Sequence, residues 1–168
     1  MENHCYENYP IKIVFLSNLV SLSIYLIGAN IVYGLGLIYT SLYLIYCLFL
    51  EINLLKKGCV NCYYYGKICG FGKGKLSALF FKRGDNIKFS KRKLSWKDMI
   101  PDMMVFILPV IAGIIQILFQ FSWNILLMMV ILLVLSMAGN AMIRVFLTCD
   151  KCVQRQLGCP AEELFNDI

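Results

Sequence analysis

The stretch IVFLSNLVSLSIYLIGANIVYGLGLIYTSLYLIYCLFL, residues 13–50, contains 38 consecutive residues without a single Asp, Glu, Lys or Arg. A second uncharged block of 41 residues runs from 103 to 143. A helix needs roughly 20 apolar residues to cross the hydrocarbon core of a bilayer, so each block is long enough for two spans. The chain of 168 residues is 60% hydrophobic, far above the composition of soluble globular domains. The sequence therefore predicts an all-α integral membrane protein.

Polar residues interrupt each block near its middle and predict where each pair of spans turns. Gly and Asn gather in GANIVYGLG, residues 28–36, and Gln, Ser and Asn surround a Trp in QFSWN, residues 120–124. Gly and Asn favour turns, and Trp favours the membrane interface. We therefore expect four transmembrane helices arranged as two hairpins, at about 11–29, 31–54, 100–120 and 123–147.

Basic residues concentrate in the loop between the two blocks. Residues 56–98 contain twelve of the sixteen Lys and Arg but only two acids, a local charge of +10, whereas the other residues sum to −4. Loops rich in Lys and Arg stay on the cytoplasmic side of a membrane. This loop and, because there are four spans, both termini are therefore predicted to be cytoplasmic in a multi-pass protein of the plasma membrane.

The same loop, 56–98, is expected to lie against anionic lipid headgroups of the bilayer. Leu76, Leu79 and Phe80 recur at helical spacing between Lys75 and Lys82, which predicts a short interfacial helix. The alternative is a merely solvated basic loop. A phosphate-binding loop is not expected, because the run of glycines and lysines at 70–75 lacks the spacing of that motif.

Six of the eight cysteines fall into two triplets with the same spacing, Cys-x2-Cys-x6-Cys: Cys59, Cys62 and Cys69, then Cys149, Cys152 and Cys159. The triplets are 90 residues apart, and the uncharged blocks follow nearly the same offset. We therefore predict two parallel repeats, and convergence of unrelated segments on a common cysteine spacing is the alternative. The first repeat would be 1–72, with its hairpin at 11–54 and the first knuckle at 58–70, and the second 100–168, with its hairpin at 100–147 and the second knuckle at 149–160. Residues 73–99 would form the basic interfacial loop between them.

Both knuckles are predicted to lie in the reducing cytosol, where closely spaced cysteines more often bind metal or do redox chemistry than form disulfides. Two thiolates at Cys-x2-Cys spacing can bind the same metal ion, and the third cysteine, seven positions further along, can supply another thiolate ligand. The six cysteines are therefore candidate metal ligands. The alternatives are that they are buried small apolar residues or lipid-modified juxtamembrane cysteines.

The doubled spacing resembles the fungal binuclear zinc cluster, in which two such halves share two zinc ions, and Asp150 and Lys151 are similar to residues of its half motif. The resemblance implies about two zinc ions per chain. It makes Cys59 and Cys149 the bridging ligands, nearest neighbours in a shared cluster, with Cys62, Cys69, Cys152 and Cys159 as terminal ligands. Only the ligand pattern is carried over: a membrane hairpin separates the halves and residues 153–158 are poorly basic, so no nucleic-acid binding is expected. Cys5 and Cys47 are expected to stay outside the cluster.

An iron–sulfur cluster at each knuckle is the competing interpretation. Such clusters usually take four protein ligands, and neither knuckle has a fourth Cys, although Asp150, His4 or Cys5 could serve. The chain also resembles small, uncharacterised four-span prokaryotic membrane proteins with cytosolic C-x-x-C knuckles followed by a Lys-rich, aromatic segment. That family has no assigned activity, so this resemblance bears on topology alone.

Catalysis has little support in the sequence. His4 is the only histidine, and neither uncharged block carries the ionisable residues that a proton relay uses. We therefore expect an integral membrane metal-binding protein whose cytosolic six-cysteine zinc centre has a structural, adaptor or metal-sensing role. A membrane-anchored iron–sulfur electron carrier is the alternative. Four short-looped helices bury few faces, so packing with a second copy or another membrane protein stays open.

Overall fold

The regular elements of the described residues are all helical, and four of these helices are long and apolar enough to cross a membrane. The computed structural model describes residues 5–85, 89 and 95–160. Within them the four candidate spans are Ile11–Tyr33, Leu37–Asn61, Lys97–Phe119 and Trp123–Cys149. Helices α1 (Ile11–Tyr33), α2 (Leu37–Lys57), α5 (Trp96–Phe119) and α6 (Trp123–Val134) supply most of their length. The prediction of four apolar spans is therefore confirmed.

The turn between the first two helices lies later than the sequence predicted. Asn30 is inside α1, so the expected turn at 29–31 was wrong, and the chain reverses between α1 and α2 at residues 34–36. Three successive i to i−3 hydrogen bonds tighten the helix end, the last joining the N–H of Gly36 to the carbonyl of Tyr33 at 3.0 Å. Gly36 then adopts a φ of +124°, which only glycine takes without strain, so glycine rather than asparagine sets the turn.

The second hairpin turns where it was predicted to turn. Helix α5 ends at Phe119 and α6 begins at Trp123, in agreement with the expected break at 120–124. At its other end α5 begins at Trp96, four residues before the expected start at 100. The carboxylate of Asp98 accepts a hydrogen bond from the N–H of Ser95 at 2.9 Å, which caps this first turn and allows the earlier start.

The fourth span is helical throughout but changes its winding. After α6 it passes through a π-helical segment η2 (Leu135–Gly139), a short α7 (Asn140–Met142) and a second π-helical segment η3 (Ile143–Cys149). A π-helix closes i to i−5 hydrogen bonds and so takes up more residues in each turn. The hydroxyl of Thr148 follows the same register and donates to the carbonyl of Ile143 at 2.8 Å.

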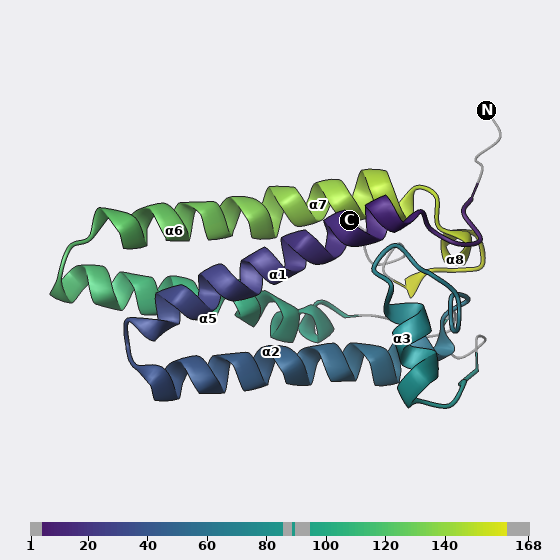
Figure 1. The fold of residues 1–168 in the computed structure, drawn as a ribbon, viewed down its shortest axis with the longest axis horizontal. Helices are drawn as coiled ribbons and strands as arrows, with labels where there is room; N and C mark the ends of the chain where they lie inside the picture. Colours follow the sequence, from purple (N-terminus) through teal and green to yellow (C-terminus); the bar gives the residue numbers. More distant parts are fainter. Residues whose placement is uncertain (1–4, 86–88, 90–94, 161–168) are drawn as a thin grey trace. The chain divides into compact units, whose positions relative to one another are not determined.

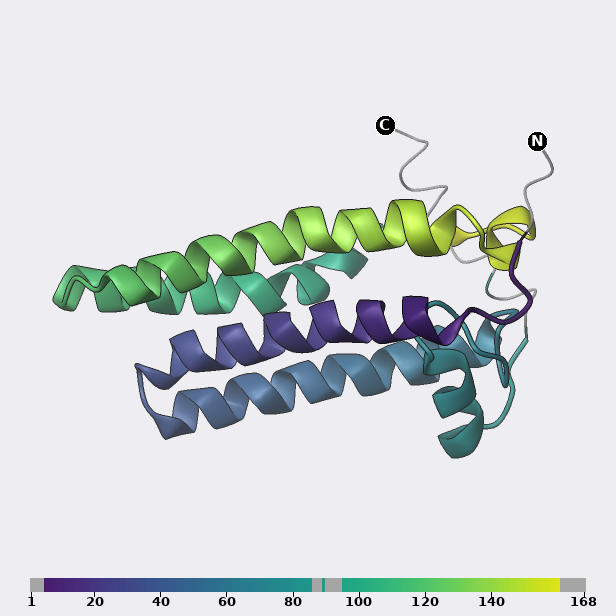
Figure 2. The same cartoon turned by 45° about the horizontal axis from the view of Figure 1, so that its top comes forward.

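The described residues fall into two compact units. The membrane unit takes those within Leu19–Leu50 and Ile100–Ala141, and the knuckle unit takes those within Met1–Asn18, Glu51–Met99 and Met142–Ile168. In the membrane unit the two helices of each hairpin lie side by side (Figures 1 and 2). The knuckle unit contains both cysteine triplets, together with α3 (Lys73–Phe80) and α8 (Val153–Gln156).

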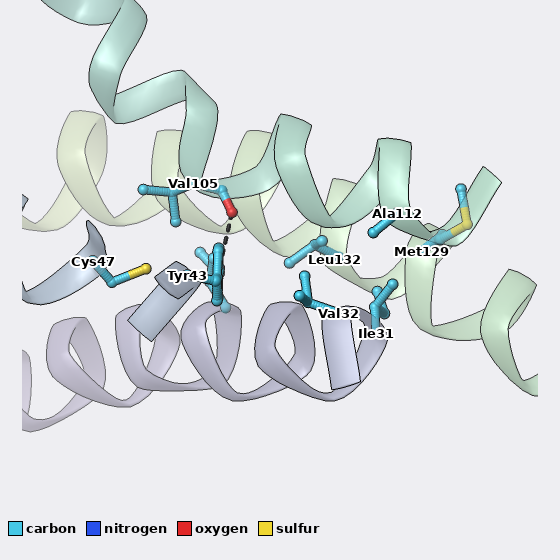
Figure 3. Close-up of a cluster of buried hydrophobic side chains, with 9 residues drawn as sticks. Ile31, Val32, Tyr43, Cys47, Val105, Ala112, Met129 and Leu132 are labelled. Atoms are coloured by element: carbon cyan, nitrogen blue, oxygen red, sulfur yellow. Dashed lines mark hydrogen bonds between the residues drawn. The ribbon is translucent and has the colours of Figure 1, made fainter. Parts of the chain in front are cut away.

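The core of the membrane unit is small and apolar, as expected for helices whose outer faces contact lipid. Figure 3 shows the buried residues at its centre, which include Val32, Tyr43, Val105 and Leu132. The Tyr43 hydroxyl donates to the carbonyl of Val105 at 2.9 Å and so satisfies a polar group inside the core. Large apolar side chains along the outer faces, among them Leu118, are exposed, which suits contact with hydrocarbon chains.

Candidate metal centre

Each knuckle begins with the same pair of turns. In the first knuckle the N–H of Cys62 donates to the carbonyl of Cys59 at 3.3 Å, and the N–H of Tyr65 donates to the carbonyl of Cys62 at 3.1 Å. The corresponding bonds of the second knuckle join Cys152 to Cys149 at 3.3 Å and Arg155 to Cys152 at 3.1 Å. The equal spacing of the cysteines is therefore accompanied by equal local backbone structure.

After these turns the two knuckles take different routes to their third cysteine. The first passes through Gly66, at a φ of +78°, and reaches Cys69 just before α3. The second forms the short helix α8 directly after Cys152 and reaches Cys159 through Gly158, at a φ of +96°. In both cases a glycine in the left-handed region reverses the chain, because other residues are strained in that conformation.

Backbone N–H groups point at the sulfurs of both knuckles. The thiol of Cys62 accepts a hydrogen bond from the N–H of Tyr64, and the thiol of Cys152 accepts from the N–H groups of Gln154 and Arg155. The N–H of Gly74 donates to the sulfur of Cys69 at 3.4 Å. Such bonds stabilise negative charge on sulfur, so the backbone is already arranged to support thiolates.

The two knuckles touch through a reciprocal pair of hydrogen bonds. The N–H of Tyr63 donates to the side-chain oxygen of Gln154 at 2.8 Å, and the N–H of Val153 donates to the hydroxyl of Tyr64 at 3.1 Å. Under the offset of 90 residues, Tyr63 corresponds to Val153 and Tyr64 to Gln154. Each knuckle therefore offers the same backbone donor and the same side-chain acceptor position, as the two sides of a twofold contact do.

The side chains that carry this contact are among the most buried in the protein. Tyr64 is 2% exposed and Gln154 is 3% exposed. Their oxygen atoms accept from partly buried N–H groups, and each such hydrogen bond contributes to holding the knuckles together. The contact places the residues that immediately follow Cys62 and Cys152 directly against each other.

The segment that precedes α1 contacts both knuckles. Tyr6 pairs with the second knuckle, its N–H donating to the carbonyl of Lys151 at 3.0 Å, and its own carbonyl accepts from the hydroxyl of Tyr64. The hydroxyl of Tyr9 donates to the carbonyl of Thr148, at the end of the fourth span. Tyr9 and Tyr64 also pack ring against ring, with centroids 5.6 Å apart. Three parts of the chain are thus tied together at one tyrosine cluster.

The two remaining cysteines lie in different settings. Cys47 is buried in the apolar core of the membrane unit. Cys5 lies beside the second knuckle, because its neighbour Tyr6 forms a β-bridge with Cys152 and its own sulfur accepts a hydrogen bond from the side chain of Gln156 at 3.2 Å. The expectation that Cys5 stays outside a metal cluster stays a prediction, and its position beside the second knuckle agrees with its earlier mention as a fourth ligand.

No disulfide joins any of the eight cysteines, all of which lie within the described residues. Burial raises the pKa of Cys62 to about 11, the N–H of Tyr64 lowers it, and the nearby thiols of Cys152, Cys69 and Cys159 raise it. Burial also raises the pKa of Cys152, against the effect of its two N–H donors. Cys62 is therefore close enough to thiols of both knuckles to interact with them electrostatically, and without a metal it is protonated at neutral pH.

The six cysteine thiols are suitable ligands for a soft metal ion, but their side chains do not surround a common point in this structure. In the part of the chain that the structure describes, no three His, Cys, Asp or Glu side chains form a group that could hold a metal ion. Six thiols with supporting N–H donors are the chemistry that zinc and iron–sulfur clusters use. Metal binding would require the thiol side chains to come closer together than they are in this structure. The bridging roles of Cys59 and Cys149 stay predictions, and His4, named above as a spare ligand, lies outside the described residues.

The residues that join the knuckles were not predicted from the sequence. Tyr64 and Gln154 stand at equivalent positions under the offset of 90, two residues after the middle cysteine of each triplet, and this signal could have identified them. The role of Tyr6 and Tyr9 had no such signal, because the contact joins residues more than a hundred positions apart. No family model, curated protein or solved structure matches this chain.

Proposed function

We propose that the protein is an integral membrane metal-binding protein whose two knuckles form one cytosolic six-cysteine centre that holds zinc. The observation that carries the proposal is the reciprocal contact, in which Tyr63 donates to Gln154 and Val153 donates to Tyr64. It joins the residues that follow the middle cysteines, Cys62 and Cys152, and the thiol of Cys152 is near enough to raise the pKa of Cys62. Independent sites would not need this contact.

Ligand counting favours a shared centre over two separate ones. Each triplet alone offers three thiolates, whereas structural zinc takes four ligands. Six thiolates can give each of about two zinc ions four sulfurs if two of them bridge, and Cys59 and Cys149 are assigned that part. Such a cluster would carry a small negative charge, which the lysine-rich loop could offset.

The proposed topology places this centre in the cytosol. Positive charge is concentrated in 56–98, so this loop, both termini and both knuckles are assigned to the cytoplasmic side of the plasma membrane. The charge-poor turns at 34–36 and 120–122 are assigned to the outside. In a reducing compartment the thiols stay available for metal.

A structural or sensing role suits this centre better than catalysis. The proposed centre lies where the segment before α1, the end of α2 and the end of the fourth span contact one another. Metal binding there would hold together segments that are far apart in the chain. Zinc binding of this kind contributes directly to folding free energy. We therefore infer one of two roles for the metal. It stabilises the fold of the cytosolic end of the protein, or its binding there signals that the cell contains enough metal.

One observation keeps the iron–sulfur alternative open. Cys5 lies beside the second knuckle and could add a fourth thiol to Cys149, Cys152 and Cys159. Four cysteines are the usual ligand set of an iron–sulfur cluster, which would make the protein a membrane-anchored electron carrier. Such a cluster would be coloured, and a zinc centre would not.

The deciding experiment is metal analysis of protein purified without oxygen in detergent. We expect a colourless protein with about two zinc ions per chain. Cys62→Ser and Cys152→Ser should each lose zinc, while Cys47→Ser, a change in the apolar core, should keep the wild-type content. Brown protein with iron and sulfide in equal amounts would support the electron carrier, and protein without stoichiometric metal would refute both proposals.

A further inference from the structure

Helix α3 begins at Lys73, four residues after Cys69, and one face of it packs within the knuckle unit. Ser77 is fully buried, and its hydroxyl donates to the carbonyl of Leu55 at 3.3 Å. Gly74 is also buried, and a side chain there would overlap the backbone carbonyl of Tyr64. These small residues allow the helix to lie close against its neighbours and determine which face is turned away.

The face turned away from the knuckle unit is apolar. Leu76 is 45% exposed, Leu79 is 75% exposed and Phe80 is 67% exposed. Residues at this spacing share one face of a helix, so the three side chains form a continuous apolar ridge. An exposed cluster of large apolar side chains marks a surface that contacts a protein or a membrane.

Positive charge surrounds this ridge. Lys75 precedes it, Lys82 and Arg83 follow it, and all three are exposed. Apolar side chains between basic residues are the pattern of helices that lie in the interface of an anionic bilayer, with the apolar side chains inserted and the cations among the phosphates.

The position of α3 favours a bilayer as the occupant of this face. Lys73 forms an ion pair with Glu51 at 2.6 Å, and Ser77 bonds to Leu55, so α3 packs on the last two turns of α2. Because α2 is a candidate membrane span, these turns lie where a span emerges among lipid headgroups. Figure 1 shows α3 beside this end of α2.

We propose that α3 docks on anionic phospholipid of the bilayer that the chain spans. Leu76, Leu79 and Phe80 insert between the headgroups, while Lys75, Lys82 and Arg83 bind the lipid phosphates. The inference rests on the exposed face and its charges and does not depend on the metal centre, so loss of metal alone leaves it intact.

Amide hydrogen exchange of the full chain in lipid nanodiscs tests this docking. One disc would contain phosphatidylcholine alone, and the other an equal mixture of phosphatidylcholine and phosphatidylglycerol. In the anionic disc we expect the amides of residues 75–81 to exchange at least about fivefold more slowly. Exchange in the membrane unit should be the same in both discs and serves as the internal reference.

Two variants make the test specific to this surface. Replacing Lys75, Lys82 and Arg83 together by Glu should abolish the difference between the discs, whereas Lys97→Glu, an exposed basic residue elsewhere, should leave it unchanged. Leu79→Ser with Phe80→Ser should speed exchange in both discs. Equal exchange of wild-type 75–81 in the two discs, or a lipid effect that survives the triple charge reversal, would overturn the proposal.

Discussion

The two halves of the chain differ in their spans but agree in their knuckles. Cys59 follows the turn at Gly36 by 23 residues, whereas Cys149 follows Ser122, at the second turn, by 27. Two π-helical segments, η2 and η3, lie in the longer path. After the spans, the backbone turns at the first two cysteines of each triplet have the same hydrogen-bond lengths in both halves. The two halves therefore differ in the length of the path to the first cysteine and agree in the backbone structure of the short segment that carries the first two thiols.

This comparison corrects one expectation from the sequence. The offset of 90 residues, which relates the triplets, would place the second turn at 124–126, but the chain turns at 120–122. The offset therefore applies to the knuckles and not to the whole hairpin. Wider helical turns take up extra residues without changing where the span ends, which explains how the difference is accommodated.

The largest expected effect comes from the proposed bridging cysteines. Cys59→Ser or Cys149→Ser should disturb both metal ions, because each of these thiolates is assigned to both. Cys69→Ser or Cys159→Ser should weaken only one. Zinc content per chain, measured for all four variants, checks the assignment, with Cys47→Ser as the control. A bridging and a terminal variant with equal zinc content would contradict it.

The second prediction is that the affinity for zinc depends on pH. The pKa of Cys62 is raised to about 11 by burial, so at neutral pH the metal-free thiol is protonated and must lose its proton to bind zinc. Zinc affinity should therefore rise as pH rises between 6 and 8, by about tenfold per pH unit for each proton released. Competition with a zinc chelator at several pH values measures this slope. An affinity independent of pH would show that the ligands are already thiolates.

Gly74, in α3, lies against the first knuckle. Gly74→Ala should destabilise that knuckle by about 1–3 kcal/mol, because the new methyl group would overlap the carbonyl oxygen of Tyr64. Gly139→Ala is the matched control, since the nearest side-chain atom would lie at 3.6 Å, an ordinary contact. Denaturant titration in detergent compares the two variants. Equal stability of both would mean that α3 does not pack as described.

The smallest effects test the reciprocity of the contact. Tyr64→Phe removes the acceptor of the Val153 N–H, and Gln154→Met removes the acceptor of the Tyr63 N–H. Each leaves a partly buried donor without its acceptor, so each should cost about 0.5–1.5 kcal/mol, and the two costs should be similar. Denaturant titration measures both. A large cost from one variant and none from the other would show that the contact is not shared equally.

The spans were predictable because the absence of charge over a long stretch has one common physical explanation, burial in hydrocarbon. The first turn was misplaced because Asn30 was given the same weight as the glycines, although a helix accommodates asparagine and only glycine tolerates the conformation at Gly36.

The candidate site was predictable only in part. Cysteine spacing identified possible ligands, since it follows directly from the sequence. The residues that hold the two knuckles against each other could not be predicted from the sequence in the same way. Tyr6 and Lys151, or Tyr64 and Val153, meet only through the tertiary structure, and a local pattern contains no information about such distant pairs.

X-ray absorption at the metal edge, on the full chain as purified, tests the central claim that the two knuckles hold metal together. A shared zinc centre predicts four sulfur neighbours around each ion at about 2.3 Å, together with scattering from a second zinc ion nearby. Three sulfurs with a nitrogen or oxygen neighbour, and no metal–metal scattering, would show two separate knuckles and contradict the shared centre.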